Sequence, residues 1–345
     1  MAQGADRSIL VTGGAGFIGS HTVVALAAAG FRPVIIDDFS NSQQRVLDGL
    51  RDILGYDVPC YVQDCNDRAI LPGLFQRENI CGVIHFAAFK AVGESMEEPL
   101  RYYRNNLGSL MTLLEVMLET GVSDLIFSSS CTVYGEPETL PVAETAPVQP
   151  AASVYGNTKQ ICEEMLRDTA AAGKPLRCIA LRYFNPVGAH PTAKIGELPL
   201  GTPNNLVPYI TQTAAGIRPQ MTIFGDDYPT PDGTCIRDFI HVMDLAEAHV
   251  AALRALQQLG ADAHSHYDVL NAGTGRGHSV LELVRLFGEA SGQRLNYRIG
   301  PRRAGDITAV YADVSKIQSQ LGWSARRSLR EALEDAWRWE EHLKQ

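Results

Sequence analysis

Tyr155 and Lys159 are the side chains whose types and spacing most directly indicate chemistry in this sequence. In a helix with about 3.6 residues per turn, the two would be neighbours on one face. A tyrosine phenol has a pKa of about 10 and is a poor base at neutral pH. A cation about 6 Å away lowers that pKa by about two units at an effective dielectric constant of about 20. Alone, such a pair can equally belong to a solvated helix face, so other residues must decide.

A glycine-rich segment could bring a second positive charge to the tyrosine, in the form of an oxidised nicotinamide ring. Residues 12–19 (TGGAGFIG) fit both G-x-x-G-x-x-G and G-x-G-x-x-G. Such glycines allow a tight turn and close approach to a pyrophosphate, which then meets the N-terminal amides of a helix. Asp37 ends the next apolar run, where a carboxylate can accept the ribose hydroxyls of adenosine. Because Asp38 follows it and disfavours a 2′-phosphate, we expect NAD rather than NADP.

Hydroxyl groups stand at the end of another apolar run, upstream of the tyrosine. Ser130 and Thr132 could hydrogen-bond a sugar hydroxyl or ketone oxygen and pass its proton to the phenolate. A serine at the end of a strand can instead form a turn or a helix cap. Asp64, after a third run, could bind the adenine amino group or form a turn.

Alternating strands and helices are predicted to position these groups. Short β-branched runs end in small or polar residues near 9–13, 33–37, 61–64, 83–87 and 125–130, and helix-like stretches closed by glycine lie between them. This alternation predicts an α/β fold with a doubly wound parallel (Rossmann-type) sheet, which binds ligands at the carboxyl ends of its strands. After Asn185 the chain becomes rich in Pro, Gly and Asn.

We therefore expect residues 1–185, with returning segments near 237–271, to form an NAD-binding domain. Residues 186–236 and 272–345 are expected to form a smaller C-terminal α/β lobe for the substrate.

Composition limits the classes of partner. The 345 residues carry a net charge of −9 without a dense Lys/Arg block, which argues against a nucleic-acid or anionic-membrane surface. The seven cysteines are scattered and typical of reduced thiols. The sequence has neither a long apolar run nor a secretory signal pattern, so a cytoplasmic protein is expected. No metal-ligand spacing is visible.

Four longer motifs occur in addition to the glycine loop, Ser130, Tyr155 and Lys159. They are residues 90–95 (KAVGES), 127–135 (FSSSCTVYG), 182–190 (RYFNPVGAH) and 237–242 (RDFIHV). Together they resemble the extended, nucleotide-sugar-using branch of the short-chain dehydrogenase/reductase superfamily, and within it the UDP-galactose 4-epimerase family. The resemblance runs from Ile9 to about Trp337.

The resemblance implies NAD-dependent epimerisation at C4 of UDP-hexoses through a transient 4-keto sugar. Tyr155 would take the proton of the 4-hydroxyl while hydride leaves C4, and hydride would return to the other face after the sugar turns. Lys159 would hold the nicotinamide ribose and lower the tyrosine pKa, and Ser130 would bind the reacting oxygen. Members of the family commonly form homodimers through two helices near the active site, which here would include the helix that carries Tyr155.

The resemblance also implies two sets of binding residues. The cofactor-binding set is Gly13, Gly16, Phe17, Ile18, Gly19, Asp37, Asp38, Asn41, Ser42, Asp64, Cys65, Phe86, Ala87, Ala88, Lys90, Asn105, Ser130, Tyr155, Lys159 and Tyr183. The substrate-binding set is Lys90, Ser130, Thr132, Tyr155, Asn185, Asn205, Leu206, Thr222, Phe224, Arg237, Arg303, Asp306 and Val310.

Val310 departs from the family pattern, which commonly has a bulky tyrosine there that restricts the pocket near sugar C2. The smaller valine predicts that UDP-N-acetylgalactosamine and UDP-N-acetylglucosamine are also interconverted. Alternatively, Val310 packs against a neighbour and the pocket narrows elsewhere.

Two alternative functions compete with epimerisation. A nucleotide-sugar 4,6-dehydratase usually has an adjacent Asp-Glu pair after the strand-end serines, where this chain has Thr132 and Val133. A non-catalytic NAD or nucleotide-sugar sensor tends to lose the Tyr or the Lys, and both are present here.

Overall fold

The computed structural model describes residues 7–260, 263–303 and 305–344, which form two compact units. The first unit comprises the described residues of 1–135, 148–182 and 246–270. The second comprises those of 136–147, 183–245 and 271–345. The expected division by function, into a cofactor domain and a substrate lobe, stays a prediction.

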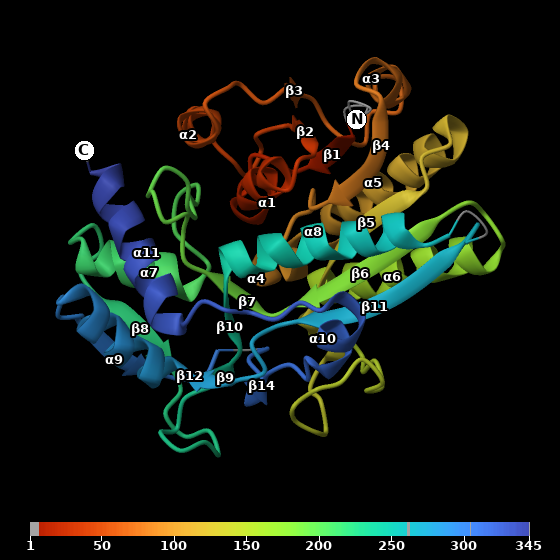
Figure 1. The fold of residues 1–345 in the computed structure, drawn as a ribbon. Coiled ribbons are helices and arrows are strands. Elements are labelled where there is room, and N and C mark those ends of the chain that lie inside the picture. The colour runs from red at the N-terminus through yellow and green to blue at the C-terminus, as the bar shows by residue number, and fades with distance from the viewer. Residues whose placement is uncertain (1–6, 261–262, 304, 345) are drawn as a thin grey trace. The chain divides into compact units, whose positions relative to one another are not determined.

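A seven-stranded sheet forms the centre of the first unit (Figure 1). Its strand order is β11-β6-β5-β4-β1-β2-β3. The strands are β1 (Ser8–Thr12), β2 (Arg32–Asp37), β3 (Cys60–Val62), β4 (Ile80–His85), β5 (Asp124–Ser130), β6 (Arg177–Tyr183) and β11 (His266–Ala272). Because β1 pairs in parallel with both β2 and β4, the winding reverses at β1, which confirms the predicted doubly wound parallel sheet.

Helices cover this sheet because its strands are apolar on both faces. Ile9, Leu10 and Val11 of β1 are completely buried. The helices are α1 (Phe17–Ala28), α2 (Arg45–Leu54), α3 (Leu71–Arg77), α4 (Val92–Glu97), α5 (Pro99–Thr120), α6 (Val154–Ala171) and α8 (Val242–Gln258), with a short 3₁₀ helix η1 (Cys131–Tyr134) after β5. Gly121 ends α5 in the left-handed conformation, and the Ser153 side chain caps α6 by accepting from the Gly156 amide.

The described residues of the second unit form three small sheets and four helices. Strand β7 (Asn185–Val187) pairs with β10 (Phe239–His241), β8 (Met221–Phe224) with β13 (Tyr297–Gly300), and β9 (Ile236–Arg237) with both β12 (His278–Ser279) and β14 (Ala309–Val310). The helices are α7 (Leu206–Ala214), α9 (Val280–Ser291), α10 (Ser315–Leu321) and α11 (Leu329–Leu343). Helices α9 and α11 both begin with a capping box, and Phe287 meets Trp337 edge-to-face between them.

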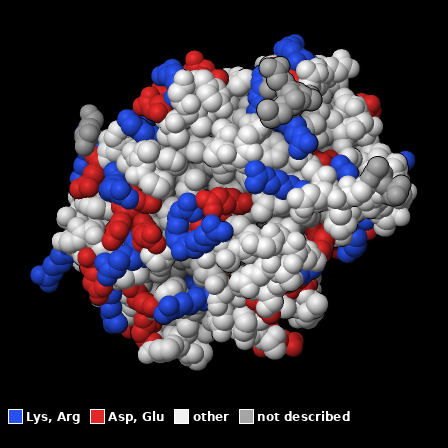
Figure 2. Space-filling view, viewed as in Figure 1, with Lys and Arg blue, Asp and Glu red and all other residues white. Residues whose placement is uncertain are grey.

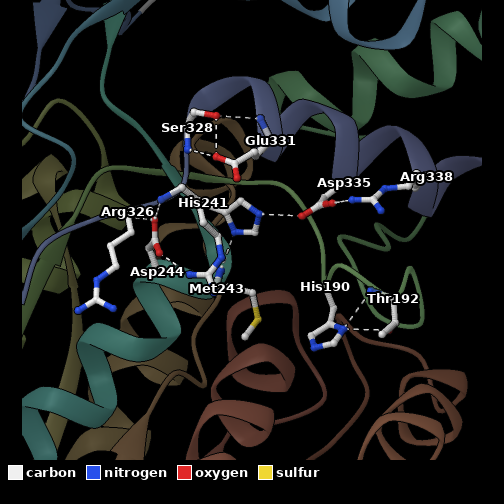
Figure 3. Close-up of polar contacts among 11 residues, drawn as sticks. His190, Thr192, His241, Met243, Asp244, Arg326, Ser328, Glu331, Asp335 and Arg338 are labelled. Carbon is white, nitrogen blue, oxygen red and sulfur yellow. Dashed lines mark hydrogen bonds and ion pairs between the residues drawn. The ribbon is translucent and has the colours of Figure 1, made fainter.

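A buried histidine links the C-terminal helix to the small sheets of the second unit (Figure 3). His241 Nδ1 accepts the Met243 amide at 3.0 Å, so Nε2 carries the proton and donates to Asp335 on α11 at 3.1 Å. His241 is therefore committed to packing and has no nitrogen available for acid–base chemistry.

On the face drawn in Figure 2, Lys and Arg side chains are interspersed with Asp and Glu. No described helix combines the length and the hydropathy needed to cross a membrane. Within the described ranges, no cluster of His, Cys, Asp and Glu side chains is arranged to hold a metal ion.

Candidate active site

The glycine loop of the first unit is packed against the end of a neighbouring strand. The Gly13 amide donates to Ile36 O at 2.8 Å, and the Gly16 amide donates to Gly13 O at 3.0 Å. Gly13 has a φ of 68°, and a β-carbon there would lie 3.0 Å from the Ala87 amide nitrogen. A β-carbon at Gly19 would overlap the Gly13 carbonyl oxygen. The loop thus leaves the first amides of α1 accessible to an anion, as a dinucleotide pyrophosphate requires.

Asp37 joins the glycine loop to the loop after β2. Its Oδ2 accepts the Ala15 amide at 2.9 Å, and its Oδ1 accepts the Ser42 hydroxyl at 2.7 Å and the Phe39 amide at 2.9 Å. Burial raises the pKa of this carboxyl, while these hydrogen bonds act against the increase. A carboxylate has about four acceptor positions, so Asp37 can also accept a ribose hydroxyl.

The other expected cofactor residues of the first unit lie on the loops that follow its strands, except for Asn105, which lies on α5. Asp38 accepts the Ser40 amide at 2.9 Å, and the exposed Asp64 accepts the Asn66 amide at 2.8 Å in a local turn. Cys65 is buried, and burial raises the pKa of its thiol to about 12. Asn41 and Lys90 are exposed, and Phe86, Ala87, Ala88 and Asn105 are half-buried.

Tyr155 and Lys159 are brought together on α6, and both are buried. The Lys159 Nζ lies 6.0 Å from the centre of the Tyr155 ring and donates to Ser128 O, on β5, at 2.7 Å. The Phe127 ring lies 4.8 Å from the same ammonium. Helix α6 and the end of β5 are thereby joined through one side chain.

Burial lowers the pKa of Lys159 to about 8, against the opposing effect of Cys162 and Glu163. The neighbouring His85 is fully buried, and this burial together with Lys159 lowers its pKa to about 3, so its ring is neutral. Lys159 is thus a positive charge beside the Tyr155 ring at neutral pH.

Ser130 combines the two roles that the sequence left open. Its Oγ caps η1 by accepting the Thr132 amide at 3.2 Å and also accepts the Thr132 hydroxyl at 3.0 Å. Because Ser130 acts as acceptor in both contacts, its own O–H proton can be donated to a substrate oxygen.

In the second unit, four of the expected substrate residues form a cluster. Arg303 lies over the Phe224 ring at 5.6 Å and donates to Asp306 at 2.8 Å. Arg237 Nη2 approaches the same carboxylate at 3.8 Å. Two guanidinium groups beside an exposed aromatic ring can bind a diphosphate and an adjacent planar base.

The remaining expected residues of the second unit take separate positions. Asn205 precedes α7 and donates to Glu197 at 2.5 Å, and Thr222 accepts from Arg298 at 3.2 Å. The Asn185 amide donates to Asp238 O at 2.9 Å. Leu206 begins α7, and Tyr183 ends β6.

Val310 is 3% exposed and lies in β14 opposite Arg237 of β9. The backbone of this valine is therefore held in register with one of the arginines of the cluster.

The sequence analysis did not identify two buried acids, Asp238 and Glu163. Asp238 is hydrogen-bonded beside the Arg237 cluster, and Glu163 is hydrogen-bonded beside Lys159 and Ser130. Asp238 accepts the Thr274 amide at 2.9 Å, the Thr274 hydroxyl at 2.6 Å and the Ala312 amide at 3.2 Å, which fixes the segment after Val310. Glu163 binds Ser129 and Arg182 in the first unit. Glu163 could have been found from the sequence, because it lies one helical turn after Lys159.

Residues 9–273 match the model of the NAD dependent epimerase/dehydratase family. The chain belongs to this family. The match confirms the resemblance drawn from the sequence. It also agrees with the glycine loop, whose tight packing requires Gly13 and Gly19 and which is hydrogen-bonded to Asp37. Among curated relatives, the chain is 50% identical over 333 residues to a UDP-glucose 4-epimerase of Neisseria meningitidis serogroup B, covering 96% of this chain and 97% of the relative.

Solved structures of other family members have the same fold. A UDP-glucose-4-epimerase from Stenotrophomonas maltophila with bound NAD and formylated UDP-arabinopyranose matches with a TM-score of 0.94 and 48% identity, over 98% of this chain and 99% of that one. A UDP-glucose 4-epimerase from Bifidobacterium longum in complex with NAD⁺ and UDP matches with a TM-score of 0.92 and 43% identity, over 97% of this chain and 98% of that one.

Proposed function

We propose that this protein interconverts UDP-galactose and UDP-glucose by NAD-dependent epimerisation at C4 through a transient 4-keto sugar. The observation that carries the proposal is the position of the buried Lys159 ammonium. It lies 6.0 Å from the ring centre of Tyr155 and donates to Ser128 O near the end of β5. Relatives of about half-identical sequence are UDP-glucose 4-epimerases, which supports the same activity here.

Gly13, Gly19 and Asp37 would hold the cofactor, with the pyrophosphate at the first turn of α1. Bound NAD supplies the hydride acceptor for the oxidation at C4 and the hydride donor for the reduction that follows. Tyr155 takes the proton of the 4-hydroxyl as a phenolate and returns it as a phenol. Lys159 stabilises the phenolate, and the Ser130 hydroxyl donates to the reacting oxygen.

The UDP portion is assigned to the cluster of the second unit. Arg237 and Arg303 match the paired oxygens of a diphosphate, and Phe224 offers a ring to the base. Binding energy from this part of the substrate allows the 4-keto sugar to turn while the nucleotide stays bound.

Analysis of the nucleotide sugars after incubation with UDP-galactose, without added NAD and in a parallel reaction with NAD, tests this function. UDP-glucose is the expected product. Loss of water from the sugar would identify a 4,6-dehydratase, for which the chain lacks the Asp-Glu pair. Unchanged UDP-galactose in both reactions would identify a non-catalytic binding protein.

The activity is further proposed to extend to UDP-N-acetylgalactosamine and UDP-N-acetylglucosamine. A valine at position 310 leaves more room than a tyrosine for an acetamido group at C2, and its backbone is held in register with Arg237. Incubation with either N-acetylated sugar should yield both, and no conversion would contradict the extension.

A homodimer is proposed through α5 and α6. A groove between α5 and α6 is lined by Met111, Leu114, Leu118 and Met165, with Glu115, Asp168 and Thr169 beside them, and Leu100 at the start of α5 is 76% exposed. A largely apolar groove of this kind commonly marks a protein interface. Light scattering should give twice the 37.6-kDa mass of the chain, and Met111→Glu should give the monomer.

The cytoplasm is the proposed compartment. All seven cysteines lie in described ranges and none forms a disulfide, which suits a reducing environment. Fractionation of the source cells should place the protein with soluble cytoplasmic markers.

A further inference from the structure

A buried ion pair lies one helical turn beyond Lys159 in the first unit. The Glu163 carboxylate on α6 accepts from Arg182 Nε at 2.9 Å and from Arg182 Nη2 at 2.5 Å. Both side chains are less than 10% exposed, at 8% and 6%. A bidentate pair of this kind fixes the direction of both side chains as well as their charges.

The same carboxylate also binds the strand that ends at the catalytic serine. The Ser129 hydroxyl donates to Glu163 Oε1 at 2.5 Å, and Ser129 is completely buried. Its neighbours on either side are Ser128, whose carbonyl accepts from Lys159, and Ser130, whose Oγ accepts from Thr132. Glu163 therefore holds the short strand segment from which both groups act.

Arg182 extends the network to η1. Its guanidinium carbon lies 4.8 Å from the centre of the Tyr134 ring, at the end of the 3₁₀ helix that Ser130 caps. The three elements that carry the catalytic groups, β5, η1 and α6, thus meet at one buried carboxylate–guanidinium pair.

The charge of Glu163 also acts on Lys159. Burial lowers the pKa of Lys159, and Cys162 and Glu163 are the groups that oppose this effect. The Cys162 thiol is buried and its pKa is raised to about 11, so it is neutral at neutral pH. Glu163 is then the anion that helps to keep the ammonium charged.

We propose that Glu163 is a positioning residue of the epimerase reaction: its carboxylate fixes the Ser128–Ser130 segment against α6 and places an acidic group one helical turn from Lys159. This inference rests on the proposed function, because it assigns Glu163 a part in preparing Tyr155 for proton transfer. Glu163 acts through Ser129, Arg182 and Lys159 and not by contact with a reacting atom.

Several other titratable groups lie near Lys159 and Glu163, and their charges must be known to interpret a pH titration. His85 on β4 is neutral, and the Tyr155 ring lies on the same helix as Lys159. Cys178 on β6 and Tyr267 on β11 lie near Glu163, and burial raises the pKa of each, so both are neutral. Arg182 is the charged group that accompanies Glu163.

The test is the titration of Lys159 in the holoenzyme by NMR of ¹³C-labelled lysine. The chain contains six lysines, so the Lys159 signal can be assigned from its loss in Lys159→Arg. In Glu163→Gln, which keeps the shape but loses the charge, the pKa of Lys159 should fall by about one unit. The turnover number for UDP-galactose should fall with little change in KM, and its decline at alkaline pH should begin at a correspondingly lower pH.

Ser129→Ala is the matched control, since it removes one hydrogen bond and keeps the carboxylate. The Lys159 titration should stay within a few tenths of a unit of wild type in this variant. If Glu163→Gln does not fold, Glu163→Gln/Arg182→Met removes both charges together, and the pKa of Lys159 should still fall, by a smaller amount. A Lys159 titration unchanged in the folded variant would overturn the proposal.

The two proposals, the role of Glu163 and the epimerase activity, can fail independently in these experiments. Wild-type protein that leaves UDP-galactose unchanged but shows the Lys159 shift in Glu163→Gln would contradict the epimerase assignment alone. Wild-type turnover with an unmoved Lys159 titration would contradict the role of Glu163 alone.

Discussion

The Lys159 ammonium lies 6.0 Å from the centre of the Tyr155 ring, and its hydrogen bond to Ser128 O holds it there. At this separation a charge lowers the pKa of a phenol by about two units at an effective dielectric constant of about 20. Neither side chain is displaced into solvent, since Lys159 is 4% and Tyr155 8% exposed. Together with the positive nicotinamide ring that the glycine loop is expected to bring, this charge would make the phenol a base suited to proton transfer near neutral pH.

Tyr155→Phe should lower the turnover of UDP-galactose by several orders of magnitude, because the substitution removes the proton-transferring group and keeps the ring. Bound NAD should remain, since the glycine loop and Asp37 are untouched. Turnover and the cofactor content of the purified protein are the measurements. Activity within tenfold of wild type would remove Tyr155 from the mechanism.

Turnover should decline as the pH rises through about 8, because burial lowers the pKa of Lys159 to about 8. Below this pH the side chain is charged and stabilises the phenolate; above it the side chain is neutral and the support is lost. Lys159→Arg keeps its charge throughout the range and should lack the alkaline decline, even at lower turnover. A wild-type rate that stays level to about pH 10 would contradict this role.

Gly19→Ala should abolish stable NAD binding, because a β-carbon there overlaps the Gly13 carbonyl oxygen and displaces the loop. Gly73→Ala on α3 is the control, since its β-carbon meets no atom within 4 Å. Cofactor content after gel filtration should fall at least tenfold in the first variant and stay at wild-type level in the second. Equal retention in both would show that the loop does not hold the cofactor.

Val310→Tyr should suppress conversion of the N-acetylated sugars by more than tenfold and leave that of UDP-galactose within a few-fold of wild type. The larger ring occupies space near sugar C2 that an acetamido group needs. Val310→Ala keeps this buried position small and apolar and serves as control. Parallel loss of both activities in Val310→Tyr would place the restriction elsewhere.

Local sequence patterns predicted the features that depend on neighbouring residues. The alternation of apolar strands and helices gave the doubly wound sheet, and the spacing of Tyr155 and Lys159 placed them on one helix face. Ser130 was identified from its position at a strand end, although its dual role as cap and donor required the observed contacts with Thr132.

Contacts between distant segments were beyond these patterns. Glu163 meets Arg182 and Ser129 only because β5, β6 and α6 are neighbours in the fold, and His241 meets Asp335 from 94 positions away in the sequence. Buried pairs of this kind depend on topology, and no periodicity of apolar residues encodes them. The short strands of the second unit were equally hard to predict, because two- to four-residue strands such as β9 and β8 are too short to show a period.

The most direct test of the central claim follows a deuterium label placed at C4 of UDP-galactose. Protein with its bound NAD, and no cofactor added, should produce UDP-glucose that retains the label at C4, because the hydride is removed and returned within one site. Loss of the label to solvent, or unlabelled product at C4, would contradict epimerisation by reversible oxidation at this carbon.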